Sequence, residues 1–310
     1  MRVAFFGSPA LAVTVLQALV ERHTVALVVA QPDKPAGRGQ KLRPPPAATK
    51  ADELGLALAQ PAKLKGNTGF KQQLSRLDLD VAVTAAYGKI LPPDLLDIPR
   101  YGFLNVHASL LPRYRGAAPI QWALINGETE TGITIMQTDE GMDTGPIRLQ
   151  KALPIDPDDT AATLAIKLGD LGAKAILEAL GKLAKDNLPS LPQDDAQASH
   201  ARLLRKEDGM IRWTLTAEQI YNRYRGVILW PGSYTYFRGE TLKVHKLTTV
   251  KRQSAPAEPG AILAIDEAGI TVAAGSDVVL LREVQPAGKG RMRAREWANG
   301  YRVEVGERFE

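Results

Sequence analysis

The sequence predicts an α/β protein in which a Rossmann-like, doubly wound, mostly parallel sheet is followed by a smaller C-terminal domain, an antiparallel β-barrel or open sheet. Over residues 1–187, short apolar runs alternate with amphipathic stretches, which is the pattern of βαβ units. Residues 188–206 open with a proline-rich, polar run that is typical of an interdomain linker. Over residues 207–310, short alternating segments separated by Gly, Pro and Asp indicate a small antiparallel barrel or open sheet.

The chain opens with a βαβ unit. Residues 3–6 predict a buried strand, Gly7 and Ser8 a turn, and Pro9 suits the first turn of a helix that runs to about Glu21. Residues 25–30 predict a second strand that is apolar on both faces, as strands of parallel sheets are. The turn after the first strand holds one glycine instead of Gly-x-Gly-x-x-Gly, so we expect no nicotinamide cofactor.

The other elements of the first domain follow from the same periodicity. Strands are expected at residues 56–59, 81–86, 102–107, 132–138 and 147–153. Helices are expected near residues 47–54, 70–77 and 117–126. Asp159 or Thr160 can cap a long amphipathic helix that runs through Leu183.

The predicted barrel domain begins with a helix near residues 217–225. Its strands are expected at residues 233–237, 241–247, 260–265, 270–274 and 278–284. A basic cluster follows, with Trp297 nearby, and its members are Lys289, Arg291, Arg293 and Arg295. A solvated helix start and a phosphate-contacting patch explain this cluster about equally well.

A second basic segment lies in the first domain. Residues 31–46 form a long loop with Lys34, Arg38, Lys41 and Arg43 against the single acid Asp33. Charge alone favours a solvated, flexible loop. The length of the loop, its glycines and its place at a carboxyl strand end favour an arm that grips phosphates.

Composition narrows the function classes. The formal net charge of +5 and the pI near 9.3 are a mild basic bias, compatible with a polyanionic partner. The absence of cysteine excludes thiol nucleophiles, disulfides and cysteine metal sites. The four histidines are scattered along the chain, which argues against a metal site: His23, His107, His200 and His245. No apolar segment approaches the about 20 residues that span a bilayer, so we expect a cytoplasmic protein without a membrane partner.

The strongest chemical signal is a pair of polar side chains at the end of one predicted strand. Asn105 and His107 are two residues apart, so they point to the same face at its carboxyl end, where open α/β sheets bind ligands. Downstream, Gly141 and Gly145 flank Asp143 and permit a tight path that carries a carboxylate toward the imidazole. Taken without this second loop, Asn105 and His107 are explained equally well as polar residues that only close the end of a strand with local hydrogen bonds.

Three runs resemble the signature of the folate-dependent formyltransferases: residues 105–121, 131–137 and 141–145. The resemblance covers nearly the whole chain and is closest to the members that act on initiator methionyl-tRNA. It implies transfer of the formyl group of 10-formyltetrahydrofolate to the α-amino group of that tRNA, for translation initiation. It also implies a catalytic first domain, a C-terminal OB-like antiparallel β-barrel domain that binds tRNA, and a basic loop that enters the acceptor arm.

Formyl transfer to an amine passes through a tetrahedral intermediate with a developing oxyanion, and it needs a group that moves a proton near neutral pH. We assign Asn105 to the formyl oxygen, His107 to oxyanion stabilisation and proton transfer, and Asp143 to orienting and charging His107. No covalent acyl-enzyme is required.

The resemblance further implies two sets of binding residues. The expected folate contacts are Ser109, Leu110, Leu111, Pro112, Tyr87, Gly88 and Ile90. The expected tRNA contacts are Lys34, Arg38, Lys41, Arg43, Lys289 and Arg291. Core filling by Leu110 and Leu111, and plain turn chemistry at Gly88, stay open, and the partner of Arg115 is undecided between a ligand anion and a local acid.

Three rival functions remain at this point. One is a related formyltransferase that acts on glycinamide ribonucleotide or on a nucleotide-linked amino sugar, which has less use for the basic loop and the barrel. The others are a noncatalytic tRNA-binding protein and a nicotinamide dehydrogenase. The co-occurrence of Asn105, His107 and Asp143 disfavours the former, and the missing glycine fingerprint disfavours the latter. We expect a monomer.

Overall fold

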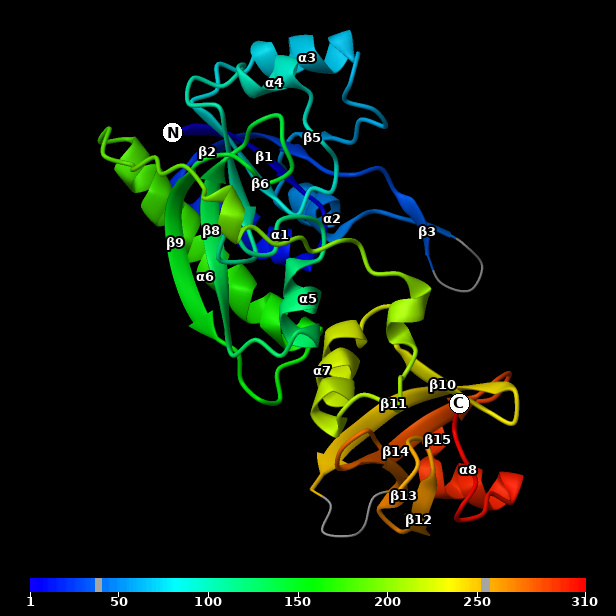
Figure 1. The fold of residues 1–310 in the computed structure, drawn as a ribbon. Helices are drawn as coiled ribbons and strands as arrows, with labels where there is room; N and C mark the ends of the chain where they lie inside the picture. The colour runs from blue at the N-terminus through cyan, green and yellow to red at the C-terminus, as the bar shows by residue number, and fades with distance from the viewer. Residues whose placement is uncertain (37–40, 252–256) are drawn as a thin grey trace. The chain divides into compact units, whose positions relative to one another are not determined.

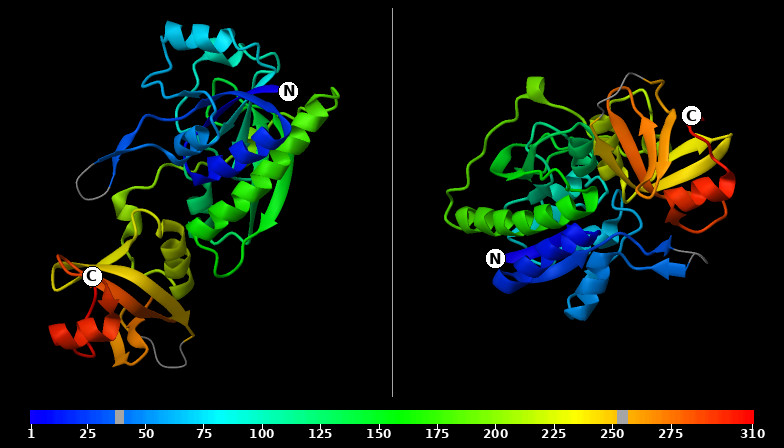
Figure 2. Two further views of the ribbon diagram at one scale, coloured as in Figure 1. Left: turned by 180° about the vertical axis from the view of Figure 1, so that it is seen from behind. Right: turned by 90° about the horizontal axis from the view of Figure 1, so that it is seen from below.

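The structure is a computed structural model that describes residues 1–36, 41–251 and 257–310. It divides into two compact units (Figures 1 and 2). Unit 1 comprises residues 1–119, 130–155 and 164–202, and unit 2 comprises residues 120–129, 156–163 and 203–310. Arg38, one of the basic residues expected to contact tRNA, lies outside the described residues. No helix in the described part of the chain is long and apolar enough to cross a membrane.

Unit 1 is built on a seven-stranded sheet with the order β5-β2-β1-β6-β7-β8-β9. Its strands are β1 (Arg2–Gly7), β2 (Thr24–Val29), β5 (Leu58–Ala59), β6 (Val81–Ala85), β7 (Phe103–His107), β8 (Glu130–Gln137) and β9 (Ile147–Pro154). The first five strands of this order pair in parallel, while β8 runs antiparallel to both of its neighbours. The prediction of a doubly wound, mostly parallel sheet is therefore confirmed.

Helices cover both faces of this sheet (Figure 1). They are α1 (Ala10–Arg22), α2 (Pro46–Glu53), α3 (Thr68–Ser75), α4 (Pro93–Leu96) and α6 (Ala161–Leu183). All of α5 (Pro119–Ile125) except Pro119 is assigned to unit 2. On one face α6 lies against α1, and Gly172 brings it close to Val106 of β7 and Ile133 of β8 (Figure 2). The opposite face carries an aromatic group in which Phe6 packs edge-on against Phe70 and Phe103.

The turn from β1 to α1 is the entry to the fold. The residues of β1 after Arg2 are fully buried, as expected of a central strand in a parallel sheet. A Cβ at Gly7 would lie 2.7 Å from the Cβ of Ala12 and from the Phe5 ring. Only glycine lets the strand turn this sharply into the helix.

Part of the basic segment 31–46, expected to be a loop, forms regular structure. It contains a two-stranded hairpin, β3 (Lys34–Ala36) and β4 (Lys41–Arg43), in which Lys34 pairs with Arg43. The sequence did not reveal this hairpin, because two strands of three residues rich in Pro, Lys and Arg have no apolar alternation to read.

Unit 2 holds a six-stranded antiparallel sheet with the order β10-β11-β14-β13-β12, and β15 pairs with β14. Its strands are β10 (Ser233–Phe237), β11 (Glu240–Val250), β12 (Ile262–Asp266), β13 (Gly269–Ala273), β14 (Val278–Pro286) and β15 (Met292–Arg293). Its helices are α7 (Ala217–Val227) and α8 (Ala294–Tyr301). The side chains of Thr216 and Gln219 form a capping box at the start of α7.

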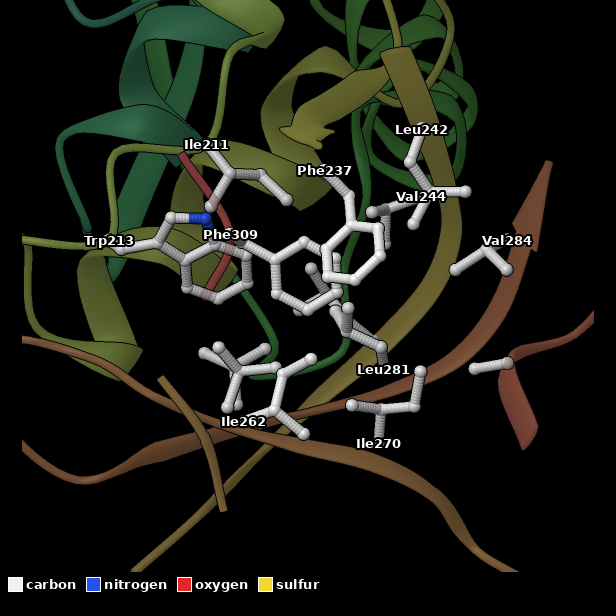
Figure 3. Close-up of a cluster of buried hydrophobic side chains, with 14 of the residues drawn as sticks. Ile211, Trp213, Phe237, Leu242, Val244, Ile262, Ile270, Leu281, Val284 and Phe309 are labelled. Carbon is white, nitrogen blue, oxygen red and sulfur yellow. The ribbon is translucent and has the colours of Figure 1, made fainter. Parts of the chain in front are cut away.

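The C-terminal segment joins the two ends of this sheet. Phe309 N–H donates to the Gly260 carbonyl just before β12, and Glu310 N–H donates to the Tyr236 carbonyl of β10. Between these bonds the Phe309 ring enters the core, where it stacks on Trp213 and packs against Phe237 (Figure 3). This closure accords with the predicted barrel-like domain, and the fold class predicted from the sequence is confirmed.

The segment expected to be a linker lies partly within unit 1. Leu191 pairs with Ile147 of β9, and the backbone of Arg115 pairs with the segment around His200. These contacts place residues 188–202 with unit 1, while the short 3₁₀ turn Lys206–Gly209 belongs to unit 2.

Candidate active site

Three polar side chains from two separate segments meet at the carboxyl end of β7. Asn105 and His107 come from this strand, and Asp143 comes from the loop between β8 and β9. Asn105 Nδ2 donates to Asp143 Oδ1 at 3.3 Å, and His107 Nδ1 lies 3.5 Å from Asp143 Oδ2. The structure thus brings together the three residues that the sequence analysis singled out for catalysis.

His107 is almost fully enclosed, with 5% of its surface exposed, and both ring nitrogens face oxygen atoms. Nε2 lies 3.0 Å from the Tyr114 carbonyl oxygen, and Nδ1 faces the Asp143 carboxylate. A neutral imidazole carries one N–H and can donate to only one of these acceptors, whereas the protonated ring can donate to both. These two acceptors fix the orientation of the ring at the end of β7.

The carboxylate of Asp143 is held by a main-chain donor. The Gly116 N–H donates to Asp143 Oδ2 at 2.9 Å, which leaves Oδ1 for Asn105. Asp143 itself adopts a φ of +57°, a left-handed conformation that is uncommon for a residue with a side chain. A Cβ at Gly145 would collide with the Gln137 carbonyl, so the loop needs glycine there to return to the sheet.

A residue that the sequence analysis did not single out orients the amide of Asn105. Thr84 lies opposite Asn105 on the neighbouring strand β6, and its hydroxyl donates to Asn105 Oδ1 at 2.8 Å. Because the oxygen of the carboxamide is engaged there, the NH₂ group faces Asp143. Thr84 sits within an apolar strand sequence, and only the register of β6 on β7 reveals its role.

The turn after β7 supplies the acceptor for His107 and the donor for Asp143. Tyr114 and Gly116 both have positive φ, of +61° and +117°. A Cβ at Gly116 would lie 2.8 Å from the Ala201 carbonyl oxygen, so this turn packs tightly against the segment before unit 2. Arg115, whose partner was undecided, is buried and forms a local ion pair with Asp195 at 2.7 Å.

The segment Ser109 to Pro112, which we expect to contact folate, is held in place by hydrogen bonds to Arg113 and Thr134. Ser109 Oγ donates to the Arg113 carbonyl at 2.6 Å, and its own carbonyl accepts from Thr134 Oγ1. The Leu111 N–H donates to Thr134 Oγ1, and its side chain is buried. The side chains of Leu110 and Pro112 stay partly exposed.

The loop after β6 contains the other expected folate contacts, and they differ in exposure. The Tyr87 ring is buried against Phe6, and burial raises the pKa of its hydroxyl to about 12. Gly88 has a φ of +74°, and a Cβ there would lie 2.6 Å from Gln31 Nε2. Ile90 is 80% exposed, which is unusual for a large apolar side chain and leaves it available to a ligand.

A cavity of about 600 Å³ opens beside the Asp143 loop. Its lining includes Leu96, Thr138, Asp139, Glu140 and Arg148. Within the described part of the chain, the buried Thr138 Oγ1 and Arg148 Nε have no hydrogen-bond partner. Both atoms are enclosed by the protein. The sequence analysis missed these residues, because they come from two segments with no shared motif.

Those basic residues expected to contact tRNA that the structure describes, all but Arg38, are exposed in both units. Lys34 donates to Gln31 Oε1, while Lys41 and Arg43 project from β4. In unit 2, Lys289 is exposed and Arg291 pairs with Glu283 at 2.6 Å.

Nowhere in residues 1–36, 41–251 and 257–310 do three or more His, Asp or Glu side chains gather to hold a metal ion.

Two family models match the sequence. The model described as formyl transferase covers residues 1–180, and the one described as formyl transferase, C-terminal domain, covers residues 203–302. The chain belongs to the formyl transferase family. Relatives of similar length support this. Methionyl-tRNA formyltransferase of Deinococcus radiodurans is 55% identical over 100% of this chain and 96% of its own length. That of Thermus thermophilus is 47% identical over 100% of this chain and 99% of its own length.

Solved structures of formyltransferases share the fold. The N-formyltransferase from Helicobacter canadensis, in complex with folinic acid and dTDP-3-aminofucose, has a TM-score of 0.69 at 17% identity. It covers 92% of this chain and 98% of its own. Membership of the family makes the chain an enzyme that transfers formyl groups. It therefore excludes the noncatalytic RNA-binding protein and the nicotinamide dehydrogenase that the sequence left open.

Proposed function

We propose that this protein transfers the formyl group of 10-formyltetrahydrofolate to the α-amino group of initiator methionyl-tRNA and so makes formylmethionyl-tRNA for translation initiation. The observation that carries the proposal is the convergence of Asn105, His107 and Asp143 in a chain of this family. Similarity over the full length to relatives named methionyl-tRNA formyltransferase supports the choice of acceptor.

In the proposed reaction the free amine attacks the formyl carbon directly, so a C–N bond forms and negative charge develops on the formyl oxygen. The Asn105 amide donates to this oxygen through the N–H that is not directed at Asp143, because Thr84 engages the amide oxygen and turns the NH₂ group toward the site. His107 lies two residues along the same strand face and adds positive charge next to the oxyanion.

Collapse of the tetrahedral intermediate breaks the bond to the donor nitrogen, which must take up a proton as it leaves. The attacking amine loses one proton in the same reaction. One group can therefore take the proton from the amine and give it to the donor nitrogen, so that protons balance. We assign the relay to His107, whose Nδ1 faces the Asp143 carboxylate at 3.5 Å. Asp143 stabilises the charged ring, as the acid of a catalytic triad does.

The cavity beside the Asp143 loop is our proposed site for the heterocyclic head of the folate donor. Its volume of about 600 Å³ is in the range of small-molecule sites. Polar side chains of its lining, Asp139 and Glu140 among them, offer hydrogen bonds to a flat, polar ring system. We propose that the loop of Tyr87, Gly88 and Ile90 lies near the same heterocyclic head. Further contacts to the donor are proposed for Ser109, Leu110, Leu111 and Pro112.

For the tRNA we propose contacts from the two basic surfaces. Lys34, Arg38, Lys41 and Arg43 would neutralise phosphates near the acceptor end, and Lys289 and Arg291 would do so elsewhere on the RNA. We propose a catalytic domain over residues 1–187, a connecting segment over residues 188–206, of which residues 188–202 pack within unit 1, and a tRNA-binding domain over residues 207–310. A monomer in the cytoplasm, where initiation takes place, is part of the same proposal.

The test is direct. Pure protein is incubated with 10-formyltetrahydrofolate and initiator methionyl-tRNA, and the α-amino group is assayed for formylation. Methionyl-tRNA in which the initiator body is replaced by an elongator body is the matched control, and glycinamide ribonucleotide and a nucleotide-linked amino sugar are the rival acceptors. Formylation of the initiator substrate is expected. Formylation of a rival acceptor alone would contradict the proposal.

A further inference from the structure

Gln193 connects a segment expected to be a linker to the loop that carries Asp143. Its Nε2 donates to the Asp143 carbonyl and to the Gly145 carbonyl, both at 2.8 Å. One side-chain NH₂ group therefore holds the main chain on both sides of Thr144. The loop is fixed where Asp143 adopts its left-handed φ of +57°.

The orientation of the Gln193 amide is set by Arg115. Arg115 Nε donates to Gln193 Oε1 at 3.0 Å, and its Nη2 pairs with Asp195 Oδ1 at 2.7 Å. A guanidinium can only donate, so the amide oxygen must face it and the amide NH₂ must face the two carbonyls. Arg115 is 5% exposed, so this chain of hydrogen bonds is largely shielded from water at its centre.

The same segment also holds the turn that contacts the catalytic trio, by which we mean Asn105, His107 and Asp143. The Arg115 N–H donates to the Ser199 carbonyl at 2.8 Å, and the Ala201 N–H donates to the Arg115 carbonyl at 2.7 Å. Ser199 Oγ accepts from the Tyr114 N–H at 2.9 Å. Residues 193–201 thus link the Asp143 loop to the turn that supplies the Tyr114 carbonyl and the Gly116 N–H.

We propose that Gln193 is a positioning residue for formyl transfer, which keeps the Asp143 carboxylate within reach of Asn105, His107 and the Gly116 N–H. This inference rests on the proposed function of the trio. Gln193 touches no reacting atom in this account. It acts by restricting the path of the loop, and a small displacement of a preorganised group is enough to slow a reaction strongly.

The sharpest variant is Gln193→Glu, which keeps the shape and the acceptor for Arg115 but loses both donors. The new carboxylate then faces the Asp143 and Gly145 carbonyls, while its pairing with Arg115 retains the fold. We expect kcat for formyl transfer to fall about tenfold, with KM for both substrates unchanged within about twofold. Gln197→Glu is the control on the same segment, because Gln197 is exposed and bonds only locally, to Asp194; its kcat should match that of the parent.

A double-mutant cycle separates positioning from simple loss of stability. In an Asp143→Ala background the Gln193→Glu change should lower kcat no further, because the group that it positions is absent. An equal further loss in that background, or parental kcat in the Gln193→Glu single variant, would overturn the inference and leave the trio intact. Parental kcat in Asp143→Ala itself would instead contradict the proposed function, and the positioning role with it. Unfolding temperatures measured for all four proteins show whether any loss follows unfolding.

Discussion

The trio at the end of β7 and the exposed basic side chains of the β3–β4 hairpin use polar groups in opposite ways. Asn105, His107 and Asp143 each have fixed partners, and His107 is 5% exposed. Lys41 and Arg43 are exposed on a short strand. Stabilising a charge that develops on one atom requires donors that are already in place, whereas attracting a polyanion requires only charge near its surface.

Because of this contrast, substitutions in the two regions should change different kinetic parameters. Changes at the trio and at its supports should lower kcat, since they remove interactions made to the transition state. Changes at the basic residues should instead raise KM for tRNA and alter its salt dependence. A basic residue that mainly lowered kcat, or a trio residue that mainly raised KM, would break the comparison.

The largest effect is expected for Asn105→Ala. It removes the donor to the formyl oxygen, so kcat should fall about a hundredfold or more, the usual loss for one oxyanion donor. Steady-state kinetics with both substrates saturating measures this. Asn187→Ala, at an exposed asparagine beyond α6, is the control and should keep parental kcat. A loss smaller than about threefold would remove Asn105 from the mechanism.

A smaller effect is expected for Gly116→Ala. The new Cβ would press on the Ala201 carbonyl at 2.8 Å, and the φ of +117° is strained for alanine. The Gly116 N–H should move away from Asp143, so kcat should fall about tenfold, and unfolding free energy by about 1–3 kcal/mol.

Gly55→Ala is the matched control for this change. Gly55 also has a positive φ, of +65°, but no atom of its surroundings lies within 4 Å of the added Cβ. It should lower stability without lowering kcat. If both variants lose kcat equally, the contact at Ala201 does not support the site.

Substitutions in the β3–β4 hairpin test whether its basic side chains act in tRNA binding and not in the chemical step. Lys41→Ala and Arg43→Ala should each raise KM for tRNA a few-fold and leave kcat at saturation unchanged. Each should also reduce the slope of log affinity against log salt by about 1, as expected when one phosphate contact is lost. Filter binding or fluorescence titration over a salt series measures the slope, with the exposed Lys185→Ala as control. Unchanged slopes would place the tRNA elsewhere.

The smallest effect is expected for Tyr87→Phe. Among the described residues its buried hydroxyl has no hydrogen-bond partner, so unfolding free energy near pH 7 should change by less than about 1 kcal/mol. Burial raises the pKa of this hydroxyl from 10.0 to about 12, so its neutral form is favoured in the folded state. Its contribution to stability is present below pH 10 and is lost as pH rises through about 12. Above pH 10, the free energy of unfolding measured by chemical denaturation should therefore fall less steeply with pH in Tyr87→Phe than in the parent.

The sequence predicted the elements whose signals are local. The apolar runs of β1, β6 and β7 lie within a residue or two of their expected bounds, because buried parallel strands are apolar throughout. The pair Asn105 and His107 was readable for the same reason, since strand periodicity fixes their shared face.

The supports of the site were not readable from the sequence. Thr84 is 21 positions from Asn105, and Gln193 is 50 positions from Asp143. Contacts over such separations depend on strand register and on the path of the chain, which no local pattern encodes. Gln193 also lies in a polar, proline-rich stretch whose composition points to a linker, although residues 188–202 lie within unit 1.

The central claim is that one carboxylate, brought to the imidazole by a separate loop, serves formyl transfer to an amine. The single-turnover rate of formylation by Asp143→Asn, with 10-formyltetrahydrofolate and initiator methionyl-tRNA both saturating, tests it most directly. The account predicts a rate about a hundredfold or more below that of the parent, with folate affinity preserved. A rate within about threefold of the parent would contradict it.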